Sequence, residues 1–137
     1  MTIPHATIPR GRGELILLAE DEDLVRRAAV RILERSGYAV VAAEDGILAM
    51  ELFATHGADI RLLITDVVMP RMGGRRLVEH VRGLRPSMPV LCTSGYAEQA
   101  SDIEKTLPDH VPFIHKPWRS ADLLVQVRDL LDNADIG

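Results

Sequence analysis

The stretch Ile60-Arg61-Leu62-Leu63-Ile64-Thr65-Asp66 is an apolar run that ends in a carboxylate, and it sets a pattern for the rest of the chain. The run Leu15-Ile16-Leu17-Leu18-Ala19 is built in the same way and is followed by two acids, Glu20 and Asp21. Continuous apolar runs of this length are typical of strands that are covered on both faces of a parallel sheet. We therefore expect buried parallel strands whose carboxyl ends carry charged groups.

Apolar runs alternate with amphipathic segments along the whole chain. The expected strands are 15–19, 38–43, 60–65, 89–93 and 111–114. The expected helices are 22–36, 45–55 with Asp45 as its cap, a segment after the loop 70–74, a segment of poor periodicity from 97 to about 106, and 120–132. Five strand–helix units with short connections predict an α/β fold, in which a doubly wound five-stranded parallel sheet carries helices on both faces.

Length, charge and cysteine content narrow the class of protein. The 137 residues fit one domain at 14–133, with 1–13 as a disordered lead or linker and 134–137 as a tail. The net charge of −4 argues against direct nucleic-acid binding, because phosphates are held by basic patches. The single cysteine excludes an internal disulfide. No apolar run reaches the length of a membrane span and residues 1–13 lack a signal-peptide core, so we expect a cytoplasmic protein.

Reactive side chains follow four of the five expected strands. They are Glu20 and Asp21, Asp66, the pair Thr93 and Ser94, and Lys116. Because the carboxyl ends of parallel strands meet at one edge of the sheet, these groups should converge. Clustered carboxylates repel one another unless a cation lies among them, and their oxygens suit Mg²⁺. A carboxylate can also attack phosphorus and form an acyl phosphate, while a metal ion and an ammonium neutralise the phosphoryl oxygens.

Three motifs contain most of these side chains. They are Ile16-Leu17-Leu18-Ala19-Glu20-Asp21-Glu22, then Leu63-Ile64-Thr65-Asp66-Val67-Val68-Met69-Pro70 with Gly73-Gly74, and Phe113-Ile114-His115-Lys116-Pro117-Trp118. The three motifs resemble those of the receiver domains of two-component response regulators. Together they extend over residues 14 to 131, nearly the whole chain. The resemblance implies a flavodoxin-like (βα)5 fold with strand order 2-1-3-4-5.

The resemblance also implies a metal site around a phosphoacceptor. Asp66 matches the acceptor aspartate of the family, and Asp21 matches an aspartate that binds Mg²⁺ directly. Glu20 matches a second acidic position, which in the family reaches the metal through water. The backbone carbonyl of Val68 would be the third protein ligand.

A switch pair and a lysine complete the implied site. Lys116 matches the lysine of the family, in which the bond corresponding to Lys116–Pro117 is cis. The switch hydroxyl is assigned to Ser94 rather than Thr93, because Ser94 lies twenty-two residues before Lys116, as the family pattern requires. Phe113 occupies the aromatic switch position, three residues before the lysine. It has no hydroxyl, so a switch that uses a tyrosine hydrogen bond is excluded.

The resemblance implies a role in two-component or phosphorelay signalling. The chain would take a phosphoryl group from the phosphohistidine of a histidine kinase or a histidine phosphotransfer domain, and would then switch a protein-interaction surface. It would catalyse only its own phosphorylation and dephosphorylation, and a weak or phosphorylation-dependent dimer is a further expectation. Residues 9–14 and 93–98 resemble receivers fused to hybrid histidine kinases. We expect no output domain in this chain, and a free-standing regulator and a part of a larger kinase both stay open.

Two other functions compete with this interpretation. A phosphatase of the haloacid-dehalogenase type would use Asp21 as its nucleophile, since Asp21-Glu22-Asp23-Leu24-Val25 fits the motif of that family after an apolar strand. That reading leaves Asp66 and the residues after it unexplained, and the late paired acids of those enzymes are missing. A pseudo-receiver, a pure interaction module, is the third reading, and the complete set of acids, hydroxyl and lysine argues against it.

Overall fold

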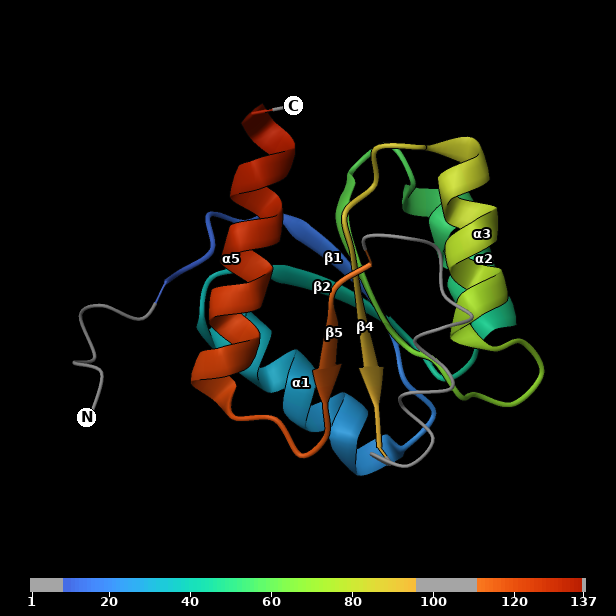
Figure 1. Cartoon of the computed structure of the whole chain (residues 1–137), viewed down its shortest axis with the longest axis horizontal. Helices are drawn as coiled ribbons and strands as arrows, with labels where there is room; N and C mark the ends of the chain where they lie inside the picture. The colour runs from blue at the N-terminus through green and yellow to red at the C-terminus, as the bar shows by residue number, and fades with distance from the viewer. Residues whose placement is uncertain (1–8, 96–110, 137) are drawn as a thin grey trace.

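The computed structural model describes residues 9–95 and 111–136, in which strands and helices alternate (Figure 1). The elements are β1 (Leu15–Ala19), α1 (Asp23–Arg35), β2 (Ala39–Ala43), α2 (Gly46–His56), β3 (Ile60–Asp66), α3 (Gly74–Leu84), β4 (Val90–Ser94), β5 (Phe113–His115) and α5 (Ser120–Ile136). All paired strands are parallel, in the order β2-β1-β3-β4-β5. The predicted fold class and strand order are confirmed.

Most predicted boundaries agree with the structure to within two residues, and the largest difference is at the C-terminus. The last helix was expected to end at Asp132 but continues to Ile136, because neither glycine nor proline interrupts it before Gly137. Asp45 caps α2 as expected, since its side chain accepts a hydrogen bond from the backbone N–H of Leu48. The helix predicted from 97 to 106 lies outside the described residues.

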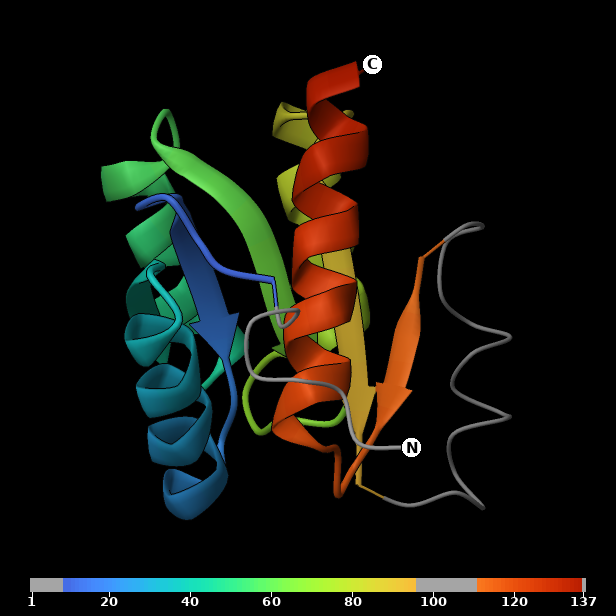
Figure 2. The ribbon, with the colours of Figure 1, turned by 90° about the vertical axis from the view of Figure 1, so that its left-hand side faces the viewer.

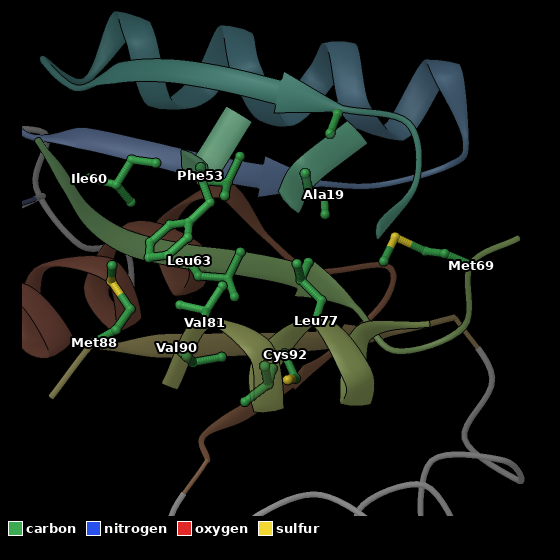
Figure 3. Close-up of a cluster of buried hydrophobic side chains, with 14 of the residues drawn as sticks. Ala19, Phe53, Ile60, Leu63, Met69, Leu77, Val81, Met88, Val90 and Cys92 are labelled. Carbon is green, nitrogen blue, oxygen red and sulfur yellow. The ribbon is translucent and has the colours of Figure 1, made fainter. Parts of the chain in front are cut away.

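Side chains that alternate along the strands build two hydrophobic cores, one on each face of the sheet. One lies under α2 and α3 and includes Leu63, Phe53 and Leu77 (Figure 3). The other lies under α1 and α5, where Leu33 and Leu123 pack on the opposite face; α5 lies in front of the sheet in Figure 2. Burying one such leucine contributes about 2 kcal/mol, so these cores hold the strand ends in fixed positions.

The segment just before β1 packs against the domain. The backbone N–H groups of Gly11 and Gly13 donate to the carbonyls of Ser36 and Gly37 at 2.6 and 2.7 Å. Gly11 lies so close to the ring of Tyr38 that a Cβ on it would be 2.5 Å from the ring. Residues 10–13 therefore contact the domain, although the sequence predicted a disordered lead or linker through Gly13.

An ion pair ties this segment to the last helix. The guanidinium of Arg128 on α5 lies 2.8 Å from the carboxylate of Glu14, and it also pairs with Asp132 at 2.8 Å. Both side chains of the Glu14–Arg128 pair are nearly nine-tenths buried. Burial raises the pKa of Glu14, but the backbone N–H of Arg12 and the Arg128 guanidinium outweigh it and hold that pKa below its ordinary value.

Among the described residues, no helix has the length and apolar character needed to cross a membrane.

We expect Glu14→Gln to lower the free energy of unfolding by about 1 kcal/mol at pH 7, because the variant loses a charged partner of Arg128. The folded-state pKa of Glu14 is depressed, so the stabilisation is present above the unfolded-state pKa and disappears as the pH falls through the folded-state value. Urea unfolding at pH 7 and at pH 3 measures both effects. The control is Glu79→Gln, which removes only an exposed pair with Arg75. Equal losses for the two variants would contradict the prediction.

Candidate functional site

Three buried charged side chains meet at the carboxyl ends of β1, β3 and β5. The Nζ atom of Lys116 donates to Oδ2 of Asp66 at 2.8 Å and also pairs with Oε1 of Glu20. The side chains of Glu20, Asp66 and Lys116 are 3%, 7% and 9% exposed. One ammonium therefore bridges two carboxylates that come from different strands, away from most of the solvent.

Local backbone structure fixes both carboxylates. The backbone N–H of Glu22 donates to Oε2 of Glu20 at 3.0 Å, which ties this carboxylate to the segment that follows β1. The backbone N–H of Val68 donates to Oδ1 of Asp66 at 3.2 Å. Pairing of β3 with β4 continues beyond Asp66, because the N–H of Val67 donates to the carbonyl of Thr93 at 3.1 Å. Asp66 is thus held by the sheet on one side and by the following loop on the other.

Burial and crowding shift the protonation equilibria of the site. Burial, together with the nearby Asp66 carboxylate, raises the pKa of Glu20 to about 6, although hydrogen bonds from Lys116 and from the Glu22 N–H act in the opposite direction. Burial opposes a charge on Lys116, but its hydrogen bonds to Asp66 and Glu20 outweigh burial and raise the pKa of the ammonium above its ordinary value. Among the described residues, two buried carboxylates thus share one buried ammonium, and this balance of charges favours a further cation.

Asp21 adds a third carboxylate at the mouth of the site. Oxygen atoms of Glu20, Asp21 and Asp66 lie within 4.8 Å of one another, and Asp21 is the most exposed of the three. Three carboxylate oxygens with one open side fit a hard divalent cation that keeps several waters. The structure brings together the three acids that the sequence predicted, while the direction of the Val68 carbonyl stays a prediction.

The β4 and β5 ends supply the remaining predicted groups. Ser94 is the buried last residue of β4, and its carbonyl accepts a hydrogen bond from the backbone N–H of Lys116 at 2.7 Å. The Lys116–Pro117 bond is cis, as the resemblance implied. Phe113 is partly buried beside the core under α3, and its ring lies 5.0 Å from that of His115. The choice of Ser94 over Thr93 as the switch hydroxyl stays a prediction.

An apolar groove of about 530 Å³ opens beside Lys116. Its walls come from α1 and from the segment between β5 and α5, and they include Leu24, Val25, Ala28, Ile32, Pro117 and Trp118. Leu24 is 82% exposed although it lies in the first turn of α1. An apolar surface next to the buried charges is therefore open to a partner.

Sequence reasoning missed two charged residues near the site. Glu22 lies 3.9 Å from Nζ of Lys116, and Arg26 donates to the carbonyl of Glu20 at 3.0 Å. Both residues are in or next to the first turn of α1, four residues apart, and so they share one helix face. That spacing is the signal that could have placed them beside the end of β1.

Comparison with known proteins assigns the family. The sequence-family model of the response regulator receiver domain matches residues 16–128 of the chain. The chain belongs to this family. The receiver domain is 36% identical over 122 residues to the sensor kinase CckA of Brucella abortus, and 32% identical over 116 residues to the response regulator receiver protein CpdR of the same organism. It covers 13% of the length of CckA, 95% of CpdR and 50% of the response regulator MprA of Mycobacterium tuberculosis.

Solved structures agree with this assignment. The crystal structure of the receiver domain from the hybrid histidine kinase CckA is 36% identical, covers 85% of the chain and 98% of that domain, and has a TM-score of 0.73. A response regulator receiver protein from Sinorhizobium medicae is 28% identical, covers 89% of the chain and 97% of that protein, and has a TM-score of 0.81. The comparisons do not favour the alternative phosphatase that would use Asp21.

The first residue of α3 lies so close to the end of β3 that a side chain at this position would not fit. A Cβ on Gly74 would overlap the carbonyl oxygen of Asp66 and lie 2.9 Å from Cα of Val67, whereas a Cβ on Gly73 would meet only the Val67 carbonyl oxygen at 3.1 Å. We expect Gly74→Ala to lower the free energy of unfolding by about 2 kcal/mol, the scale of an overpacked contact. The matched Gly73→Ala should cost less than half as much. Urea unfolding of both variants checks this, and equal losses would refute it.

Proposed function

We propose that this receiver domain accepts a phosphoryl group on Asp66 from a phosphohistidine, with Mg²⁺ bound beside it, in two-component or phosphorelay signalling. The observation that carries the proposal is the bridge from Lys116 to Asp66 and Glu20 at the ends of three strands. A buried carboxylate next to an ammonium and two further acids has the nucleophile, the fixed positive charge and the metal ligands that phosphoryl transfer to a carboxylate requires.

The proposed metal ligands are Asp21, Asp66 and the backbone carbonyl of Val68, with Glu20 acting through water. When bound, Mg²⁺ would neutralise phosphoryl oxygens as charge develops on them. The acidic trio supports this choice, because its oxygens lie within 4.8 Å of one another and Asp21 leaves the site open on one side.

The transfer step needs a free oxygen on Asp66 and a cation for the phosphoryl group. An oxygen of Asp66 attacks phosphorus in line, the bond from phosphorus to the histidine nitrogen breaks, and the electron pair returns to the imidazole. Lys116 already lies 2.8 Å from Asp66 Oδ2, so a short movement would bring its ammonium to a phosphoryl oxygen. The domain would catalyse only this reaction and the hydrolysis of its own acyl phosphate.

A switch built from Ser94 and Phe113 would report phosphorylation. A hydrogen bond from the Ser94 hydroxyl to a phosphoryl oxygen would draw the end of β4 inward, and the partly buried Phe113 ring would move into the space that this leaves. Burying most of a phenyl ring contributes about 2 kcal/mol, which biases a two-state equilibrium more than tenfold. The pairing of β4 with β5, with Cys92 opposite Phe113, supports a link between the two residues.

The proposed partner is a histidine kinase or a histidine phosphotransfer domain. A donor histidine must reach Asp66, and the apolar groove beside Lys116, with the exposed Leu24, offers a contact surface close to that path. Direct nucleic-acid binding is not part of the proposal, given the net charge of −4. A cytoplasmic location and a weak or phosphorylation-dependent dimer stay predictions.

We expect incubation with acetyl phosphate and Mg²⁺ to place an acyl phosphate on Asp66. Borohydride reduction followed by peptide mapping locates it, and Asp66→Asn should carry none, because an amide is not a nucleophile of this kind. Asp122→Asn, in the exposed first turn of α5, is the matched control and should be labelled like the wild type. Label that remains on the Asp66→Asn protein would refute the assignment. Label on Asp21 would favour the phosphatase reading.

We expect Asp21→Ala to weaken Mg²⁺ binding at least about tenfold, the scale of a lost ligand or of its support. Trp118 is the only tryptophan and lines the same small cavity as Glu20, so its fluorescence can follow the titration. Asp122→Ala, on the exposed first turn of α5, controls for loss of negative charge. Equal Mg²⁺ affinity in wild type and Asp21→Ala would show that the metal ligands are assigned wrongly.

A further inference from the structure

We propose that Arg26 is a positioning residue, whose guanidinium fixes the peptide group between Glu20 and Asp21 and thereby aims the proposed metal ligand Asp21. The inference rests on the proposed function, because it concerns the same metal site. Neither the motifs nor the acidic trio includes Arg26, which lies one turn into α1.

Two hydrogen bonds hold the guanidinium in place. Nη1 of Arg26 donates to the carbonyl oxygen of Glu20 at 3.0 Å, and Nη2 donates to Oδ1 of Asp23 at 2.5 Å. The Arg26 side chain is only 17% exposed, whereas its neighbour Arg27 is exposed. A planar guanidinium with two fixed partners is a rigid support, because its donors point in set directions.

The carbonyl that Arg26 contacts lies where the sheet ends. Ala19 is the last residue of β1, and the backbone N–H of Glu20 still donates to the carbonyl of Ala43 at 2.9 Å. The Glu20 carbonyl lies past the last registered pairs of β1 with its two neighbouring strands, and Arg26 supplies its donor. This carbonyl and the N–H of Asp21 belong to one planar peptide group, so fixing the carbonyl also fixes the backbone from which the Asp21 carboxylate projects.

Arg26 also places a permanent positive charge next to the acidic trio. Lys116 is committed to Glu20 and Asp66, and in the proposed reaction its ammonium moves to a phosphoryl oxygen. Arg26 donates to a backbone carbonyl and to Asp23, not to a proposed metal ligand's carboxylate, so neither metal nor phosphoryl binding has to displace it. An arginine does not lose its proton at any physiological pH. Lys116 would therefore change its contacts during phosphoryl transfer, whereas Arg26 would keep its own contacts throughout.

The test compares Arg26→Ala, Arg26→Gln, Arg26→Lys and the matched control Arg27→Ala. Mg²⁺ binding is followed by Trp118 fluorescence, and the rate of phosphorylation by acetyl phosphate is measured over a range of Mg²⁺ concentrations. We expect Arg26→Ala to weaken Mg²⁺ binding about tenfold, the scale seen when a residue that orients a ligand is lost. Its phosphorylation rate at saturating Mg²⁺ should stay within about twofold of wild type, because Arg26 touches no reacting atom. Arg26→Lys should recover part of the affinity, and Arg27→Ala should bind like the wild type.

A second measurement uses the metal-free protein. The NMR signal of the Asp21 backbone amide should shift in Arg26→Ala and stay in place in Arg27→Ala, because only the first variant frees the shared peptide group. If Arg26→Ala does not fold, Arg26→Gln, which keeps one donor but not the charge, takes its place in both measurements.

Wild-type Mg²⁺ affinity in the folded Arg26 variants would overturn the proposal, and so would a loss of maximal rate with unchanged affinity. If the wild-type protein itself binds no Mg²⁺ or is not labelled on Asp66, the proposed function fails, and the positioning role falls with it. A wild type that behaves as proposed beside unaffected Arg26 variants refutes the positioning role alone.

Discussion

The bridge of Lys116 between Glu20 and Asp66 is the interaction on which the site depends. Removing three charged side chains from water is costly, and their mutual attraction offsets that cost only when the geometry is good. Here the cost is offset by short contacts and by backbone donors from Glu22 and Val68. Such a cluster persists only if the strands that carry it cannot move apart, and the two cores on either face of the sheet meet that requirement.

Close backbone packing adds to this constraint around Asp66. The first residue of α3, Gly74, has no side chain, and its N–H donates to the carbonyl of Val67 at 2.9 Å, so the helix begins directly against the end of β3. The loop between them turns through Arg71, which adopts a positive φ of 67° and lies 3.5 Å from the buried Asp45 carboxylate. That pair ties the loop to the cap of α2. The backbone around Asp66 is thus fixed by contacts that reach both α3 and the start of α2.

The sequence predicted what depends on periodicity and order along the chain. Apolar runs located the strands, and their carboxyl ends located Glu20, Asp21, Asp66 and Lys116, because parallel strands bring such ends to one edge. It did not predict contacts that depend on where long side chains reach. The pairing of Glu14 with Arg128, 114 residues apart, and the contact of Arg26 with a carbonyl depend on rotamers and on burial, which no local pattern records. The packing of Gly11 on Tyr38 was also missed, because a segment rich in glycine and arginine is typical of a free linker.

The backbone of Lys116 connects the buried charged side chains to the edge of the sheet. Its N–H donates to the carbonyl of Ser94, and β5 pairs with β4 through Phe113 opposite Cys92. Any group that adds negative charge at Asp66 changes the balance between the two carboxylates that share the ammonium, so the side chain of Lys116 must redistribute its contacts. The same residue is fixed to β4 through its backbone and is followed by the cis bond to Pro117 and by Trp118, which packs on the core under α1 and α5. Lys116 therefore connects the buried charges at the strand ends both to the β4–β5 edge and, through Trp118, to the core under α1 and α5.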